Sequence, residues 1–279
     1  MRVSSRSALV SVALALGVGL IPAARASAAG EPVNVVVLKE HGVGTPATAQ
    51  PYLDKFMDIA AKENGWGGGA GKYQTQRAAA EAWIQGNKPH YGILSLGAFL
   101  GLKGTYGLEP IGQVAVTQAG GQQYFVVSKT AGDLAACKGK KLVSDHIDDA
   151  AFIEKVVFDG KAKLSDFTLV PTRRSTQTSK TVINDEAECA LIDDAQMAEL
   201  PKLDGGAAVK QVWASAKLPA LVVVAFPAAP GAEKSAFQGS LPRLCQGGGT
   251  QICNEVGIQS LTSAGASTYA AVVAAYARP

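Results

Sequence analysis

The sequence predicts a two-lobed α/β protein with an open, mainly parallel sheet in each lobe. Three observations support this prediction. Short apolar runs alternate with helical patterns along the chain, which is typical of successive βα units. A secretory signal occupies residues 1–28, and the remaining roughly 250 residues suit two lobes better than one core. Four cysteines in that remaining part favour folding in an oxidising compartment.

The signal has the three regions of an exported protein. Arg2 and Arg6 form the basic region, residues 8–21 form the apolar region, and Ala26-Ser27-Ala28 is the cleavage site. The apolar region is too short for a spanning helix, which needs roughly 20 residues. We therefore expect cleavage and release into the periplasm without a lipid anchor, with an uncleaved membrane anchor as the alternative.

The charge of the mature chain is balanced. The whole sequence has 26 basic and 23 acidic residues, and the excess is accounted for by Arg2, Arg6 and Arg25 of the signal. Nucleic-acid binding requires a clustered basic field. The balance therefore argues against nucleic acid as a partner.

The cysteines indicate disulfide bonds rather than a metal site. Their number is even, which favours pairing in an exported protein, and three pairings are possible. The sequence has no Cys-x-x-Cys motif or histidine-rich ligand set. We expect no metal and no cofactor. The four are Cys137, Cys189, Cys245 and Cys253.

The first part of the chain reads as strand, helix and glycine-rich loop. Four valines in 33–38 predict a strand buried on both faces. A helix should follow from about Pro51, because proline is tolerated in a first turn. The cluster Gly65–Lys72 should be a loop. It is not a phosphate-binding loop, because Trp66 replaces the first required glycine.

The same alternation continues to the C-terminus. Strands are predicted at 91–94, 112–116, 123–128, 141–144, 167–171, 189–193, 209–215 and 221–226, and helices at 75–85, 149–158, 176–184, 232–243 and 265–277, with a short helical piece before Cys137.

Four stretches in this order resemble the type 2 periplasmic binding proteins, in the branch of phosphonate-, phosphite- and phosphate-binding components of ABC transporters. They are YGILSLGAFLGL (91–102), YFVVSKTAGDLAACKGKKLV (124–143), NDEAECALIDD (184–194) and KLPALVVVAFP (217–227). They are distributed over nearly the whole mature chain.

The resemblance implies a two-lobed flytrap that captures a ligand between its lobes. The first lobe would comprise 29–120 and 221–279, and the second 121–220. The partners would be a small-molecule or lipid ligand and an inner-membrane permease, and the protein would act as a monomer. In the family's strand order, the strands after Cys137 and Cys189 are neighbours. This order implies the pairs Cys137–Cys189 and Cys245–Cys253, the latter around a flexible glycine loop.

One motif departs from the family. Phosphonate binders place a hydroxyl-rich stretch after the central strand of the second lobe, whereas this chain has Asp148 and Asp149 there. Carboxylates at a helix start stabilise the helix dipole and would repel an incoming phosphonate. The family's anion site cannot be transferred to these positions.

Ligands of open α/β sheets bind at the carboxyl ends of the strands. This rule selects loops after five predicted strands, and Arg173 and Arg174 before a helix start form the best anion site among them. A local capping or solvated-loop role is the alternative for each loop. Tyr124 is added because it lies near the hinge. The candidates are Glu40, His41, Gly44, Thr45, Ser95, Tyr124, Ser144, Asp145, His146, Arg173, Arg174, Ser175, Thr176 and Asp193.

Three functions compete. A solute-binding protein is favoured, with a phosphonate- or phosphate-class ligand preferred. A lipid-binding protein would use the same fold with a larger apolar cleft. A secreted enzyme is disfavoured, since neither a Gly-x-Ser-x-Gly nor a His-Glu-x-x-His motif occurs, and no catalytic residue is assigned.

Overall fold

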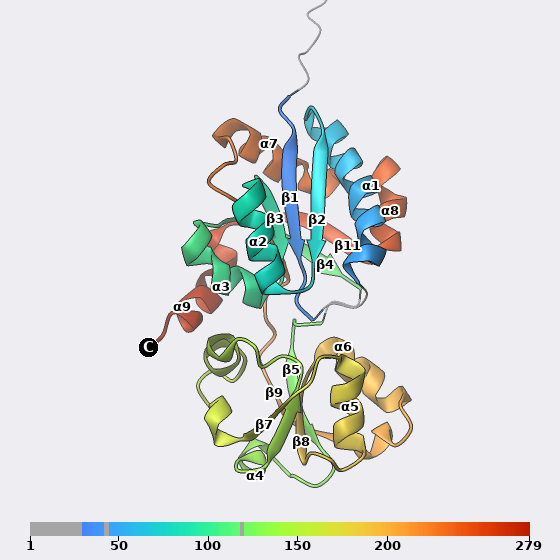
Figure 1. The fold of residues 1–279 in the computed structure, drawn as a ribbon, viewed down its shortest axis with the longest axis vertical. Helices are drawn as coiled ribbons and strands as arrows, with labels where there is room; N and C mark the ends of the chain where they lie inside the picture. Colours follow the sequence, from blue (N-terminus) through green and yellow to red (C-terminus); the bar gives the residue numbers. More distant parts are fainter. Residues whose placement is uncertain (1–29, 42–44, 118–119) are drawn as a thin grey trace, which may run out of the picture.

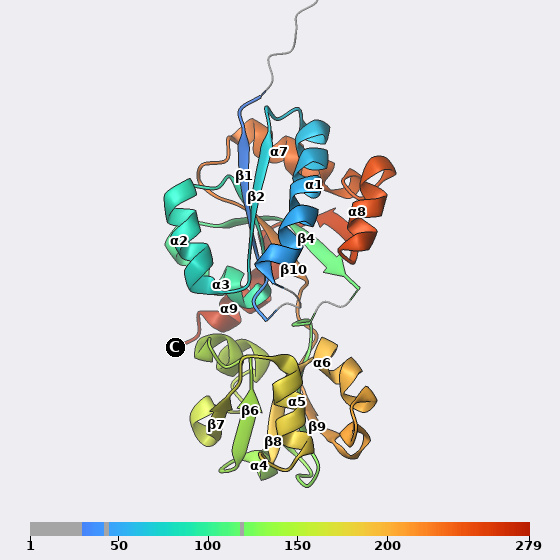
Figure 2. The ribbon, with the colours of Figure 1, turned by 45° about the vertical axis from the view of Figure 1, so that its right-hand side comes forward.

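The protein has two lobes, one above the other in the computed structural model, which describes residues 30–41, 45–117 and 120–279 (Figures 1 and 2). The predicted signal and Gly44 lie outside the described residues. The first sheet has the order β11 (Ile258–Ser263), β4 (Glu109–Val116), β10 (Leu221–Ala225), β3 (Tyr91–Leu94), β1 (Val33–Leu38) and β2 (Gly69–Gln74). The second has the order β7 (Thr168–Pro171), β6 (Lys141–Ser144), β8 (Cys189–Asp193), β5 (Tyr124–Ser128) and β9 (Lys210–Ala214).

The predicted fold class is confirmed. In the first sheet β1, β2, β3 and β4 run in one direction, and β10 and β11 run against them. In the second sheet only β5 is reversed. The chain crosses between lobes after β4 and again after β9. The first strand after each crossing, β5 or β10, is a reversed strand.

Helices cover both faces of the first sheet. One face packs against α1 (Pro46–Asn64), α7 (Gly231–Ser240) and α8 (Thr250–Glu255). The other packs against α2 (Arg77–Asn87), α3 (Leu96–Tyr106) and α9 (Ala266–Tyr276). The second lobe contains α4 (Leu134–Cys137), the π-helical turn η1 (Phe152–Val157), α5 (Ser175–Ile183) and α6 (Asp194–Glu199).

The apolar core continues from one lobe into the other. Phe99 and Leu94 of the first lobe belong to the same buried cluster as Leu142 and Phe158 of the second. Gly97 lies against the Phe152 ring, where an added Cβ would be 3.4 Å from a ring carbon. The lobes are thus in direct contact in this arrangement.

The first helix begins earlier than predicted. Thr45 accepts a hydrogen bond from the Thr48 amide, the Thr48 side chain accepts one from Thr45, and α1 begins at Pro46. This reciprocal cap satisfies two amides at the start of the helix. Pro51 therefore lies inside α1, at an exposed position, instead of in its first turn.

The glycine cluster is also not simply a loop, because β2 begins within it at Gly69. A Cβ on Gly71 would lie 2.6 Å from Leu53 Cγ, and one on Gly69 would lie 2.9 Å from the Met57 carbonyl oxygen. The glycines therefore allow α1 to pack directly on an edge strand. Close helix approach explains Gly69 and Gly71, whereas Gly65 ends α1 in a left-handed conformation.

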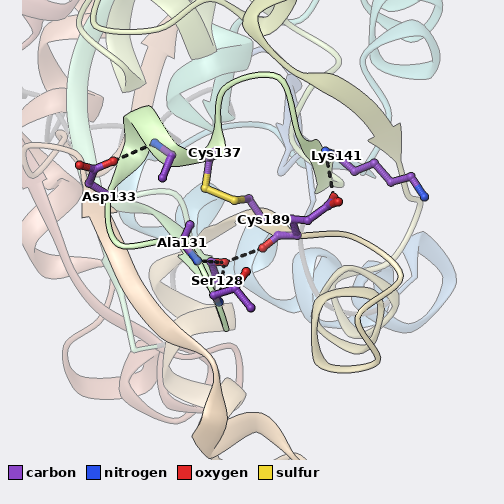
Figure 3. Close-up of a disulfide and its surroundings, with 9 residues drawn as sticks. Ser128, Ala131, Asp133, Cys137, Lys141 and Cys189 are labelled. Atoms are coloured by element: carbon purple, nitrogen blue, oxygen red, sulfur yellow. Dashed lines mark hydrogen bonds between the residues drawn. A yellow bond between two sulfur atoms is a disulfide. The ribbon is translucent and has the colours of Figure 1, made fainter.

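Both predicted disulfides are confirmed. Cys137 at the end of α4 is bonded to Cys189 at the start of β8 (Figure 3), and Cys245 is bonded to Cys253. Since β6 and β8 are parallel neighbours, the first bond joins segments that enter the sheet side by side. Asp133 caps α4 by accepting from the Ala136 amide at 2.8 Å, which positions Cys137.

Candidate functional site

A small cavity lies between the lobes, at the carboxyl ends of their parallel strands. Its volume is about 60 Å³. The first lobe contributes Lys39, Glu40 and His41 after β1, Arg77, and Ser95, Leu96 and Gly97 at the start of α3. The crossings and the second lobe contribute Gly120, Gly121, Gln122, Tyr124, His146, Asp148, Asp149, Phe152, Asp193 and Pro219, and β10 of the first sheet adds Leu221.

Arg77 joins the lobes at this cavity. Its Nε donates to Glu40 of the same lobe at 2.7 Å, and its Nη1 donates to Asp149 of the second lobe at 2.9 Å. Burial acts to lower the pKa of Arg77, but its hydrogen bonds and ion pairs with the two carboxylates raise it overall. The guanidinium is thus a permanent cation bound to both lobes.

Asp149 receives further contacts. Its Oδ1 accepts from the Phe152 amide at 2.9 Å, which caps the helical segment containing η1, and its Oδ2 accepts from Tyr276 Oη at 3.2 Å. Tyr276 is the last residue of α9 in the first lobe. The same carboxylate therefore caps a helix of the second lobe and contacts the first lobe twice.

Two histidines, one from each lobe, contact each other in the lining of the cavity. The rings of His41 and His146 are 4.7 Å apart in an edge-to-face arrangement. His41 has a left-handed backbone with φ of 58°, an uncommon conformation for a residue with a Cβ. Desolvation and the neighbouring His146 lower the pKa of His41, although part of the residue remains exposed.

The hydrogen bonds of His146 define its tautomer. Its Nε2 lies 2.7 Å from Gln196 Oε1, which also accepts from the Asp193 amide. Since that oxygen is an acceptor, Nε2 must carry the proton in neutral His146. Nδ1 is then a buried acceptor that no described residue satisfies.

The floor of the second lobe is a buried polar network beneath His146. Ser144 Oγ donates to the Leu191 carbonyl at 2.8 Å and accepts from the His146 amide. Asp145 accepts from Thr178 and Gln196. Such a network holds the imidazole in one orientation.

Asp193 combines a structural contact with exposure to the cavity. Its Oδ1 accepts from the Gln196 amide at 2.9 Å and caps α6. Burial raises the pKa of Asp193. Burial lowers the pKa of Lys39. The negative charges of Asp193 and Asp194 act in the opposite direction and raise it, but burial has the larger effect.

The cavity has a surplus of carboxylates. Glu40, Asp148, Asp149 and Asp193 line it, against the two cations Lys39 and Arg77. Arg77 is already bound to two of the acids. The lining carboxylates therefore exceed the lysine and arginine side chains by two.

The structure brings together six of the predicted residues, Glu40, His41, Ser95, Tyr124, His146 and Asp193. Ser144 and Asp145 lie buried beneath the cavity, Thr45 caps α1, and the Ser175 carbonyl is near Gln196. Arg173, Arg174 and Thr176 are exposed and do not line the cavity, because β7 is an edge strand. No motif in the sequence marks Arg77 as a cavity residue, and Asp149 was excluded only as an anion ligand.

Among the described residues, no cluster of three or more histidine, cysteine or acidic side chains could hold a metal ion. No helix in the described ranges is long and apolar enough to span a membrane. No family model and no curated protein sequence matches this chain.

Solved structures do match it. XAC2383 from Xanthomonas citri, bound to chloride ion, has a TM-score of 0.68 at 10% identity over 88% of this chain and 97% of that chain. A binding protein component of an ABC phosphonate transporter from Pseudomonas aeruginosa has a TM-score of 0.62 at 10% identity over 87% and 84%.

The fold is that of the type 2 periplasmic binding proteins. A third similar structure of this fold is the periplasmic aliphatic sulphonate binding protein SsuA from Escherichia coli, with a TM-score of 0.54 at 13% identity over 89% of this chain and 79% of that chain. Identities this low establish the fold, whereas a ligand must be argued from the cavity.

Proposed function

We propose that this protein is the extracytoplasmic solute-binding component of an ABC-type transport system, which captures a small ligand between its lobes and delivers it to a membrane permease. The observation that carries this proposal is the cavity between the lobes, at the carboxyl ends of strands from both. The two disulfides and the sequence signal support an extracytoplasmic location. Binding, rather than catalysis, fits a site whose polar groups are held in capping and bridging contacts.

The ligand in this cavity is a small hydrogen-bond donor, and we favour an amine. The surplus of carboxylates attracts a cation, and an ammonium group also presents the hydrogen-bond donors that these carboxylates accept. The phosphonate class suggested by the sequence resemblance conflicts with this surplus. The closed cavity is also much smaller than a usual drug-sized site, which excludes a lipid within it.

The test is a binding comparison of small amines with methylphosphonate and phosphate. Thermal-shift screening followed by calorimetry should find an amine that binds and neither oxyanion. Asp148→Asn removes a carboxylate at the exposed edge of the cavity and should weaken the amine severalfold, whereas Asp204→Asn, at an exposed site elsewhere in the second lobe, should not.

Two outcomes would contradict the proposal. Tighter binding of methylphosphonate than of every amine would overturn the assignment of ligand charge. A ligand that binds without reducing the radius of gyration in small-angle scattering would argue against capture by lobe closure.

A further inference from the structure

A second, larger cavity lies in the first lobe. Its volume is about 640 Å³, within the range of small-molecule sites. It lies over the sheet, between the N-terminal half of α1 and the connection from α8 to β11. Figures 1 and 2 show α1 and α8 on the same side of the sheet.

The walls of this lobe 1 cavity are mainly apolar. Strands β1, β3, β4 and β10 provide the floor with Val37, Ile93, Val114, Val116 and Leu221, and α1 provides one wall with Ala49, Tyr52, Leu53 and Phe56. A polar solute would gain few hydrogen bonds on such walls. An alkyl chain would gain the free energy of leaving water.

Exposed side chains mark the mouth of the cavity. Tyr52 and Val256 are 40% and 39% exposed, and they belong to the few large hydrophobic residues exposed in the described part of the chain. They lie on the two opposite walls, on α1 and after α8. Exposed apolar groups that border a cavity are typical of a ligand entrance.

Lys39, the residue after β1, lines both this cavity and the interlobe cavity. No described carboxylate lies within 4.0 Å of its ammonium group, although Asp193 and Asp194 act on it at longer range. A half-buried ammonium without a direct counter-ion is a suitable partner for an anionic group.

We propose that the lobe 1 cavity binds the single alkyl chain of an amphiphile whose carboxylate contacts Lys39. The chain lies along the valine and isoleucine side chains of the sheet, and Tyr52 and Val256 cover its solvent end. This site shares Lys39 with the interlobe cavity, but it does not depend on the ligand assigned there.

Dodecanoate is the test ligand, with hexanoate as its short-chain comparison. Each methylene buried from water improves affinity about fourfold, so dodecanoate should bind far more tightly than hexanoate. Ala49 lines the cavity, so the graded series Ala49→Leu and Ala49→Phe should fill it stepwise and weaken dodecanoate at least tenfold in the larger variant. Ala47→Phe, at an exposed position of α1 outside the cavity, is the matched control.

The head group is tested with dodecanol and with Lys39→Met. Dodecanol should bind more weakly than dodecanoate to the unmodified protein, and Lys39→Met should remove that difference. Lys72→Met, at an exposed site on β2, should leave the difference between dodecanoate and dodecanol unchanged.

Calorimetry together with the ligand-induced rise in Tm decides the result. Absence of dodecanoate binding, or equal weakening by Ala49→Phe and Ala47→Phe, would overturn the chain site. Unchanged discrimination between dodecanoate and dodecanol in Lys39→Met would overturn the assignment of the head group. Retained amine binding in Ala49→Phe would show that the two sites are independent.

Discussion

Asp193 shows how one side chain can serve both the fold and the cavity. Its carboxylate caps α6 through the Gln196 amide and also faces the interlobe cavity. A cap requires only an acceptor oxygen, whereas the buried negative charge costs desolvation free energy. We therefore expect the negative charge of Asp193 to contribute to ligand binding, and its acceptor oxygen to stabilise the fold.

Asp193→Asn keeps an acceptor for the cap and removes the charge, whereas Asp193→Ala removes both. Because burial raises the pKa of Asp193, the native protein holds its proton at a higher pH than the unfolded chain does. The stability of the unmodified protein should thus gain a contribution as pH falls from the raised pKa toward about 4, the unfolded value. Asp193→Asn should lose this pH dependence and be more stable than the unmodified protein at pH 7.

Denaturant titrations between pH 4 and pH 7 measure these differences. Asp193→Ala should be less stable than Asp193→Asn by about 1 kcal/mol, the usual contribution of a cap. Equal stability of the two variants would mean that the capping bond contributes nothing measurable.

The candidate site was only partly predictable from single residues. The rule that ligands bind after strands found Glu40, His41 and His146, because their position depends on chain order alone. The same rule also selected Arg173, which is exposed and does not line the cavity, so its role in ligand binding stays a prediction. It could not find Arg77, whose partners Glu40 and Asp149 are 37 and 72 residues away.

At the scale of elements, strands rich in β-branched residues were predictable and the glycine-rich strand was not. β1 and β10 contain consecutive valines, which suit a strand buried on both faces. β2 has little side-chain pattern, and its identity depends on the packing of α1 over Gly69 and Gly71. That packing is a tertiary contact, which a local sequence pattern does not reveal.

Gly71→Ala tests this packing. The added methyl group would overlap the Leu53 side chain, and overpacking of this kind costs about 1–3 kcal/mol. Gly68→Ala is the matched control, because a Cβ there would meet no atom within 4 Å. Thermal or denaturant unfolding should show a loss for Gly71→Ala alone, and equal effects of the two changes would contradict the close approach of α1 to β2.

At the scale of the whole molecule, contacts between the lobes hold the closed arrangement. Arg77 joins Asp149 to the first lobe, Tyr276 contacts the same carboxylate, and Arg278 near the C-terminus bonds Asp159 of the second lobe at 2.8 Å. The C-terminal segment after α9 therefore acts with Arg77 in restraining lobe movement.

Arg77→Gln should shift the protein toward an open arrangement. The ion pair to Asp149 is lost, so small-angle scattering without ligand should show a larger radius of gyration. Arg243→Gln breaks an ion pair with Glu63 inside the first lobe and should leave the radius unchanged. An unchanged radius for Arg77→Gln would mean that the apolar interface alone maintains closure.

In the chain, the strands of the second sheet lie between β4 and β10 of the first sheet, and this order has a consequence for folding kinetics. β10 lies between β3 and β4, yet the whole second sheet is synthesised before it. Closing so long a loop in a disordered chain is slow. Once β5 and β9 have paired, however, the Leu218 amide bonds the Gln122 carbonyl at 2.7 Å, and this contact holds the two crossing segments side by side. The second lobe, folded early, would then deliver β10 directly to its place beside β4, so that the order of assembly is determined by the path of the chain.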